Sequence, residues 1–265
     1  MLLPLLIAAF AQPLTETKTH TTPIVAPRVD IVGEGFNGTD PTGPILVFAG
    51  CDGFDLGKGD PFRATGGRLE RLRIVTNGTG GTALKFFAAS KAERPGEIIL
   101  RDLKILGLSD LNGRGKNNWE RGLVIDGGEL NEVNASGVRS ISVEWLRVAG
   151  CLSDSIALRN VTHFHGRDIQ INQGTAPEEK VPTFVIESSR HIFLSQMNLF
   201  GELHLRDCHN VIFDGYAQSI SVDAKCRGIV LRGIVDRLTV EKGAVGRAEV
   251  LSKKIDSPSR TFSIR

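Results

Sequence analysis

The chain has 265 residues, of which 41% are hydrophobic and 23% are charged. This balance is that of an ordinary folded protein and excludes intrinsic disorder, a collagen-like fibre and a multi-span membrane protein. The formal net charge of +2, from 32 Lys and Arg against 30 Asp and Glu, is too small for a general nucleic-acid-binding protein. The 30 glycines favour strands and turns over helices.

The first residues predict export. The apolar run from Met1 ends in Ala9-Phe-Ala, which matches the hydrophobic core and small-residue cleavage site of a secretory signal peptide. A buried N-terminal cap is the alternative, because the positively charged start of a signal peptide is missing. We therefore expect a signal peptide and linker over residues 1–27, a folded domain over 28–251 and a tail over 252–265. A secreted protein is expected, with a virion-borne protein as the alternative.

A repeated pattern runs through most of the chain. Each copy contains a short strand of alternating apolar residues, a polar corner and a second apolar strand that ends near glycine. The clearest copies span residues 183–196, 202–215 and 219–233. Earlier copies, with longer insertions between them, begin at Leu69, Ile99, Val143 and Leu158. Repeats of about 17–30 residues with two or three short strands are typical of a solenoid. The sequence predicts an all-β fold, a single-stranded right-handed parallel β-helix.

The first coil resembles that of a known superfamily. Val29-Asp-Ile-Val-Gly-Glu-Gly, followed by Ile45-Leu-Val-Phe, is similar to the opening of the pectin-lyase-like right-handed parallel β-helix proteins. The resemblance covers residues 28–251, rests on the repeat pattern, and implies a protein that acts on or binds polysaccharide. The Asn-Thr-Asp, Asp-Asp, Gly-His-Gly and Arg-Ile-Lys motifs of polygalacturonases are missing from the chain. No catalytic residue therefore carries over by motif.

Matching positions of successive coils lie above one another in a solenoid, so the sequence predicts which side chains share a column. We align the strands on the residues that close them, which are Gly107, Gly150, Gly166, Ser195, Gly215 and Gly233. Two residues before each marker is a large apolar residue that is expected inside: Ile105, Val148, Phe164, Phe193, Phe213 and Leu231. By alternation, the residues three before the marker face outward. In the upper coils these are Lys104, Arg147 and His163, with Arg73 extending the column.

A line of like charges favours an anionic ligand, and an acidic polysaccharide lying along the coils fits it. The alternative is that solvated Lys and Arg decorate an exposed strand and pair with nearby carboxylates. Polar loops near the same coils are expected to wall a groove over the column. The substrate-binding candidates are Arg73, Trp119, Arg121, Asp126 and Asp168. For Trp119 two roles stay open, which are stacking on a sugar ring and anchoring its own loop.

The reaction that suits this column is β-elimination on a uronate polymer, which begins with loss of the C5 proton of the sugar. Lys104 or Arg147 would neutralise the sugar carboxylate. His163 or His165 would take the proton, because imidazole titrates near neutral pH. These four residues are the catalytic candidates for a lyase, although each histidine has an inert surface role as its alternative.

Two other functions stay open. A glycoside hydrolase needs two carboxylates about 5–10 Å apart, and Asp207, Asp223 and Glu187 fall on similar corners of adjacent coils, where neighbouring Arg and Lys favour salt bridges instead. A non-catalytic adhesin, tailspike-like protein or structural solenoid is favoured by the missing motifs and by only 6% aromatic residues. No cofactor is expected, and Asp126, Glu129 and Glu132 are the one grouping suggested for Ca²⁺.

The cysteines and the tail add two expectations. Cys208 and Cys226 lie 18 residues apart, about one coil, so they fit a disulfide in an exported protein or two buried thiols in a cytosolic one. The sequence after Leu251 contains no clear amphipathic helix to cover the final coil, and an uncovered strand edge invites pairing. We expect a homo-oligomer or a tail that folds over the end. No nucleic-acid partner and no membrane span are expected.

Overall fold

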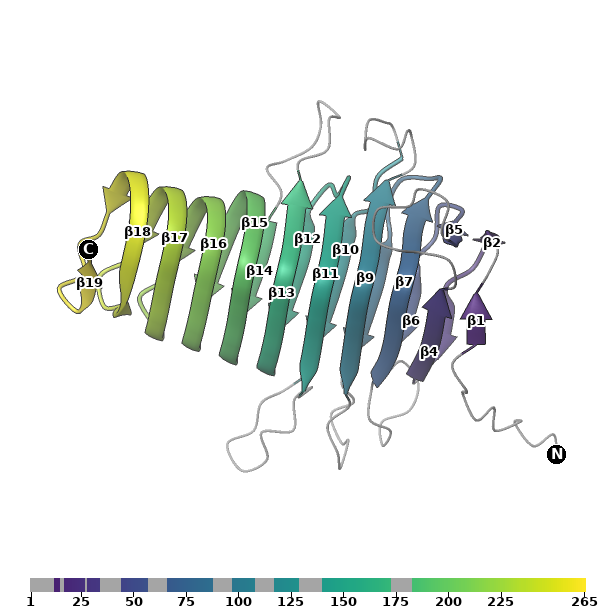
Figure 1. Cartoon of the computed structure of the whole chain (residues 1–265), viewed down its shortest axis with the longest axis horizontal. Helices are drawn as coiled ribbons and strands as arrows, with labels where there is room; N and C mark the ends of the chain where they lie inside the picture. The colour runs from purple at the N-terminus through teal and green to yellow at the C-terminus, as the bar shows by residue number, and fades with distance from the viewer. Residues whose placement is uncertain are drawn as a thin grey trace.

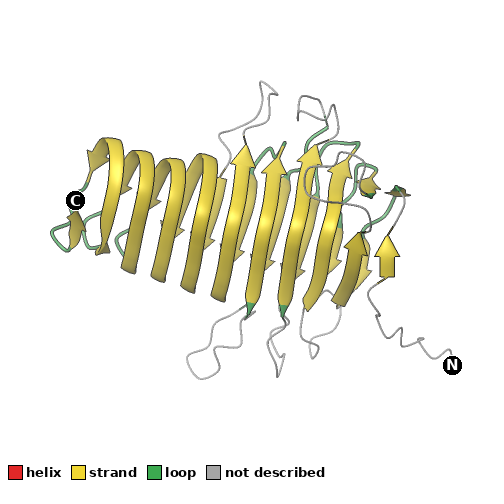
Figure 2. Cartoon of the chain, in the orientation of Figure 1, coloured by secondary structure: helices red, strands yellow, loops and turns green. Residues whose placement is uncertain are grey.

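The chain is a long coil of parallel strands. The computed structural model describes residues 12–14, 17–26, 28–33, 44–56, 66–87, 97–107, 117–128, 140–172 and 183–265. These residues form strands and loops and no helix (Figure 2). Every strand pairing among them is parallel. The predicted all-β parallel β-helix is confirmed.

The strands follow one another without intervening helices. The first nine are β1 (Gln12–Leu14), β2 (Lys18–His20), β3 (Ile24–Ala26), β4 (Arg28–Gly33), β5 (Ile45–Phe48), β6 (Phe54–Leu56), β7 (Gly66–Thr76), β8 (Thr82–Phe87) and β9 (Ile98–Gly107). The next five are β10 (Arg121–Asp126), β11 (Ile141–Ala149), β12 (Asp154–Arg159), β13 (Thr162–Asn172) and β14 (Thr183–Glu187). The last five are β15 (Arg190–Arg206), β16 (His209–Val222), β17 (Arg227–Val240), β18 (Val245–Asp256) and β19 (Phe262–Ile264).

Each coil has three faces. In one coil, residues 141–144 of β11 lie on the first face, residues 146–149 on the second, and β12 on the third. The near strands in Figure 1 run upward while the chain advances from right to left and returns behind them, which is the sense of a right-handed coil. Position along the sequence therefore becomes position along the axis, and residues one coil apart become neighbours.

The core is a stack of apolar side chains inside the coil. On the first face one inward column consists of Leu69, Leu100, Val143, Gly166, Leu194, Phe213 and Leu231, each paired with the next. Gly166 interrupts this column of side chains because the ring of Phe164 takes up the space. A Cβ at Gly166 would come within 2.8 Å of Phe164 Cε1. The predicted inward direction is correct for Ile105, Val148, Phe164, Phe213 and Leu231, which are all buried. Their predicted alignment in one column is wrong, because Val148 pairs with Ile171 and Phe164 pairs with Ile192.

The expected position of Phe193 is wrong. Phe193 faces outward with 37% of its surface exposed, while its neighbours Ile192 and Leu194 face inward. Leu194, and not Phe193, pairs with Gly166 and Phe213. Alignment of Ser195 with the glycine markers shifted this strand by one residue, which reverses the side-chain direction of a strand.

The corners between faces are formed by left-handed residues stacked on one another. The first corner, between the first and second faces, consists of Arg71, Asp102, Trp145, Asp168 and Gln196, with φ between 52° and 58°, followed by Gly215 and Gly233. A second corner, between the third and first faces, contains Ser140, His163, His191 and Asn210, with φ between 56° and 58°. Left-handed backbone is costly for residues with a Cβ, so both corners depend on the flanking strands to hold them.

The coil extends beyond the expected domain limits. β1, β2 and β3 lie within the expected linker and pair with β4, β5 and β6. At the other end β18 continues into the expected tail, and β19 pairs only with residues 246–248 of β18. Among the described residues nothing pairs with the outer edge of β18 after Ala248, so most of the final edge is uncovered. The expected signal sequence, residues 1–11, lies outside the described residues.

Candidate functional site

Three cations are stacked on the second face. Arg73 pairs with Lys104 in the register of β7 and β9, and Lys104 pairs with Arg147 in the register of β9 and β11. Neighbouring strands lie about 4.8 Å apart. Arg73 is buried, Lys104 is half-buried and Arg147 is exposed. The predicted stacking of these residues is confirmed, and we call Arg73, Lys104 and Arg147 the cation column.

The proximity of these charges changes the titration of the middle residue. Burial lowers the pKa of Lys104 below its ordinary value, and the positive charges of Arg147 and Arg73 lower it further. A lysine whose charged form is disfavoured gives up its proton more readily than a solvated lysine. An anion placed against the column would reverse the effect, because it favours the charged form.

Beyond Arg147, the positions in register with the cation column are occupied by neutral polar residues and then by aliphatic ones. Arg147 is paired in register with Gln170, and its Nε donates a hydrogen bond to Gln170 Oε1 at 2.7 Å. Gln170 Nε2 donates in turn to Asn172 Oδ1 at 3.1 Å. The next positions are Asn198 and Tyr216, and beyond them the column becomes aliphatic. Hydrogen-bonding groups thus continue the line that the cations begin.

An exposed tryptophan stands at the first corner beside the cation column. Trp145 has 57% of its surface exposed and a φ of 58°. It precedes Arg147 by two residues in β11, and Asp102 and Asp168 occupy the same corner in the coils before and after it. Sequence reasoning missed Trp145. The left-handed backbone is shared by the other residues of this corner, and what sets Trp145 apart is a large aromatic side chain open to solvent at such a position. We call the cation column, Gln170, Trp145 and Asp168 together the Trp145 face.

The two acidic residues that flank Trp145 have different surroundings. Burial raises the pKa of Asp102 above its ordinary value, and the carboxylate of Glu144 adds to the rise against the opposing charge of Arg101. Asp168 forms an ion pair with Arg167, with Nε and Oδ2 3.4 Å apart. Asp168, a predicted substrate-binding residue, therefore lies close to the cation column.

The charges of the first face are arranged in the opposite way. Glu70, Arg101, Glu144 and Arg167 follow one another in register. Arg101 lies 3.8 Å from Glu70 and 3.1 Å from Glu144, and Arg167 lies 3.8 Å from Glu144. Opposite charges on successive rungs neutralise one another. The first face therefore shows how this coil stacks charges when they serve its own structure, and the cation column departs from that pattern.

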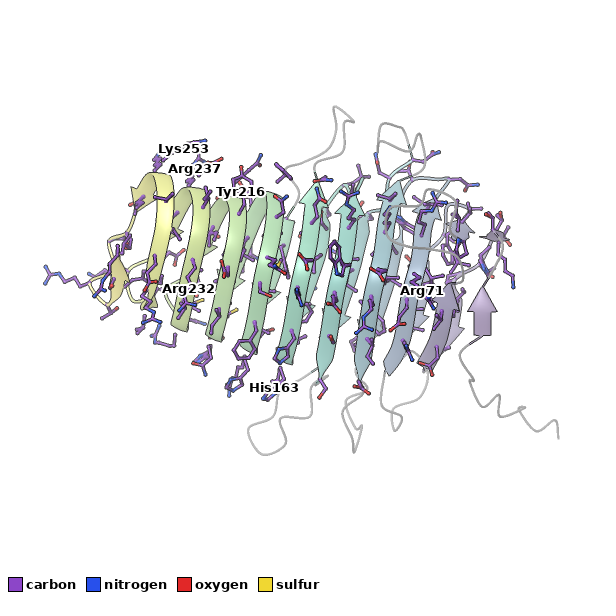
Figure 3. The ribbon with its side chains drawn as sticks, viewed as in Figure 1. Arg71, His163, Tyr216, Arg232, Arg237 and Lys253 are labelled. Atoms are coloured by element: carbon purple, nitrogen blue, oxygen red, sulfur yellow. The ribbon has the colours of Figure 1, made fainter. Side chains whose placement is uncertain are left out.

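The predicted histidines do not join the cation column. The register partner of Arg147 is Gln170, and not His163 as the sequence alignment predicted. His163 lies in the second corner, where its ring stacks on His191 with centroids 4.9 Å apart. His165 lies on the first face and stacks on Phe193 at 5.0 Å. Figure 3 shows His163 at the lower edge of the strands, well away from Arg71 of the first corner. The cause is the alignment of Gly166 with Gly107 and Gly150. Those two glycines follow the second face, whereas Gly166 lies on the first face.

Three other predicted binding residues are separate from the Trp145 face. Trp119 is fully buried, and its Nε1 donates a hydrogen bond to the carbonyl of Leu106 at 3.1 Å. Of its two possible roles, the structure supports the anchoring of its own segment to the core and contradicts stacking on a sugar. Arg121 Nε lies 3.9 Å from Asp154 Oδ2. Asp126 accepts a hydrogen bond from the backbone N–H of Gly128 at 3.0 Å. Arg121 and Asp126 begin and end β10 on the third face.

The carboxylates considered for hydrolysis have local structural roles. Asp223 accepts hydrogen bonds from the backbone N–H groups of Asp207, Lys225 and Cys226 at 3.0, 3.0 and 3.2 Å. It therefore stabilises the turn after β16. Glu187 forms an ion pair with Arg159 at 3.5 Å. These contacts account for the carboxylates of Asp223 and Glu187 without a substrate.

The described residues contain neither a cluster of metal ligands nor a membrane-spanning helix. Within these ranges no group of three or more His, Cys, Asp or Glu side chains is arranged to hold a metal ion. Of the residues suggested for Ca²⁺, Glu129 and Glu132 lie outside the described part of the chain. In the same described ranges, no helix has the length and apolar character needed to cross a bilayer.

The fold defines the class of this protein as an all-β parallel β-helix, or β-solenoid. No protein-family model, no curated protein and no solved structure matches the chain. Its function is therefore argued from the chemistry of its surface.

The lowered pKa of Lys104 predicts how stability depends on pH. In the unfolded chain a lysine titrates near a pKa of about 10.4. Because the folded protein releases this proton at a lower pH, the unfolded chain binds more protons between the two pKa values, and the contribution of Lys104 to stability rises with pH across that window. The free energy of unfolding of the wild type relative to Lys104→Met, measured in urea from neutral to alkaline pH, should therefore increase. Lys254→Met, a change in the exposed last long strand, is the control. A difference that is constant with pH would contradict the lowered pKa.

Proposed function

We propose that this protein binds an acidic polysaccharide along the Trp145 face. The observation that carries the proposal is the stack of three cations on adjacent coils beside an exposed tryptophan. A sugar ring presents an apolar face that packs on an indole, and its carboxylate is the natural partner of a guanidinium. Trp145 and Arg147 supply these two groups from the same strand. Membership of the pectin-lyase-like superfamily belongs to the same proposal, and the parallel coil supports it.

The geometry suits an extended polymer. Coils repeat about every 4.8 Å, so a chain lying along the axis can place a carboxylate against the exposed Arg147 and pass over the half-buried Lys104, while the buried Arg73 contributes only its charge. Gln170 and Asn198 continue the same line and offer hydrogen bonds to hydroxyl groups. Binding of this kind depends on salt, because exposed charges are screened within about 8–10 Å at moderate ionic strength. The partner is an extracellular polymer, which agrees with the export that the N-terminal sequence predicts.

A second function, β-elimination, is favoured by the lowered pKa of Lys104. It requires the sugar carboxylate to pair with Arg147 and not with Lys104, because an anion against Lys104 would favour its charged form. A base that removes the C5 proton of a uronate must be neutral when it acts, and its pKa should lie near the working pH. The same site holds Arg147, which can neutralise the sugar carboxylate and stabilise the negative charge that develops. Lys104 therefore replaces His163 and His165 as the proposed base. A non-catalytic adhesin that uses the same face is the alternative.

The test is a panel of uronate polymers with a neutral glucan as control. We expect binding of at least one uronate polymer that weakens as salt is added, and no binding of the glucan. The double variant Lys104→Ala with Arg147→Ala should weaken binding by about tenfold or more, because hydrogen bonds to charged groups contribute about 1.5–3 kcal/mol each. Arg232→Ala with Lys254→Ala removes two cations from distant coils and is the matched control.

Two readouts separate the outcomes. The ultraviolet absorbance of unsaturated sugars reports β-elimination, and it should appear for the wild type and disappear in Lys104→Ala. Binding without absorbance on any polymer would reject the lyase and keep the adhesin. Equal binding by the double variant and its control would reject the Trp145 face as the site.

A further inference from the structure

Two cysteines occupy equivalent inward positions on adjacent coils. Cys208 directly precedes His209 of β16, and Cys226 directly precedes Arg227 of β17, and these two strand residues are paired in register. The backbone N–H of Arg227 donates to the carbonyl of Cys208 at 2.9 Å. Both cysteines are fully buried. Equivalent residues on neighbouring parallel strands lie about 4.8 Å apart, within the Cα separation of about 4.4–6.8 Å that a disulfide requires.

A hydrogen bond already joins the two cysteines, from the backbone of one to the sulfur of the other. The backbone N–H of Cys208 donates to Cys226 Sγ at 3.4 Å. Cys208 Sγ donates to the carbonyl of Ile186 at 3.1 Å, and Cys226 Sγ donates to the carbonyl of Leu205 at 3.4 Å. Both sulfur atoms therefore lie inside the coil on adjacent turns, and both cysteines are present as free thiols.

The contact makes the two thiols unequal. The hydrogen bond between Cys208 and Cys226 lowers the pKa of Cys208 below the ordinary thiol value. The same hydrogen bond raises the pKa of Cys226. A thiolate, and not a thiol, is the nucleophile in cysteine chemistry. The lower pKa therefore favours Cys208 as the attacking thiol, with Cys226 on the adjacent coil as its partner.

We propose that Cys208 and Cys226 form an oxidisable pair that is converted to a disulfide linking two coils. With hydrogen peroxide as oxidant, the Cys208 thiolate attacks one oxygen, the O–O bond breaks, and the released hydroxide takes up a proton to become water. The product is a sulfenic acid on Cys208. The sulfur of Cys226 then attacks the sulfenic sulfur, an S–S bond forms, and the proton of Cys226 leaves with the hydroxyl group as a second water. Two thiols lose two electrons and the peroxide gains two.

The position of the pair gives the bond a consequence. It closes a loop of 18 residues close to the C-terminal end, where the edge of β18 is uncovered after Ala248. A solenoid unfolds most readily from its ends, because an end coil has only one neighbour. A covalent link between the coils of β16 and β17 restrains these two coils, so the oxidised protein should unfold later and resist proteolysis between β16 and β17.

The test counts thiols and maps the bond. The reduced protein should titrate four thiols under denaturing conditions, and two after peroxide treatment of the folded protein. The intact mass should fall by two hydrogen atoms, and a peptide digest should contain Cys208 joined to Cys226. The oxidised form should also melt at a higher temperature. Cys208→Ser and Cys226→Ser should abolish both the mass change and the shift in melting temperature. Cys51→Ser, a change in a distant coil, should keep both.

Three results would overturn the inference. They are four titratable thiols after oxidation, a bond that includes Cys51 or Cys151, and sulfinic acid on Cys208 without a bond to Cys226. The wild-type digest decides the question even where a serine variant fails to fold. The pair is independent of the Trp145 face, so failure of either proposal leaves the other standing.

Discussion

Replacing Trp145 by glycine is expected to weaken binding of the acidic polysaccharide by about tenfold, because the stacking of one aromatic ring and the burial of its apolar surface are together worth more than about 1.4 kcal/mol. The substitution should not harm the fold. Glycine adopts a φ of 58° without steric cost, and this relief offsets its greater freedom in the unfolded chain, so stability should stay within about 1 kcal/mol of the wild type. Titration of the polymer by calorimetry, beside urea unfolding, measures both.

Two controls make this result specific. Trp145→Asn keeps a residue that tolerates left-handed backbone while removing the ring, and should lose binding like the glycine variant. Leu251→Ala truncates a side chain that is 75% exposed on a distant coil, and should bind like the wild type. Unchanged binding by Trp145→Gly would mean that the indole does not contact the polymer.

Replacing Trp119 by alanine is expected to have the opposite effect. Trp119 is fully buried in the core, and truncation of a buried aromatic side chain costs about 3–5 kcal/mol. The variant should lose this much free energy of unfolding in urea, followed by far-ultraviolet circular dichroism. The fraction that stays folded should bind polymer normally, because the indole does not reach the surface.

A milder substitution separates packing from hydrogen bonding. Trp119→Phe keeps most of the buried apolar volume and loses the hydrogen bond to the carbonyl of Leu106. It should cost less than Trp119→Ala, with a contribution of about 1 kcal/mol from that bond. A Trp119→Ala protein as stable as the wild type would place the indole outside the core.

The cation column was predictable because its coils share a local pattern. Leu69-Glu-Arg-Leu-Arg, Leu100-Arg-Asp-Leu-Lys and Val143-Glu-Trp-Leu-Arg each place two outward residues between two inward apolar residues, with a cation directly after. Gly166-Arg-Asp-Ile-Gln continues the pattern, and reading it would have aligned Gln170 with Arg147. The closing glycines were a poorer guide, because glycine occurs on more than one face of the coil.

The same pattern contained the signal for Trp145. Two successive outward residues break the alternation of a strand and mark a corner, and Trp145 is the second of such a pair in β11. The burial of Trp119 had no comparable local signal. Its surroundings include Leu106 of β9 and Cys151 between β11 and β12, so only the stacked coils show that it points inward. Phe193 was misplaced for a related reason, since one residue of error in register turns a side chain from the core to the surface.

Because the coils follow one another along the axis, the length of the molecule depends on the number of its coils. The Trp145 face lies on β7, β9, β11 and β13, whereas β16, β17 and β18 come later along the axis and contribute none of its members. Trimming the chain backwards from its C-terminus, one turn at a time, shortens the rod while the recognition surface keeps its full set of neighbours. The axial length of the coil and the composition of the Trp145 face are therefore separable, and the length can be altered without changing the residues of that face.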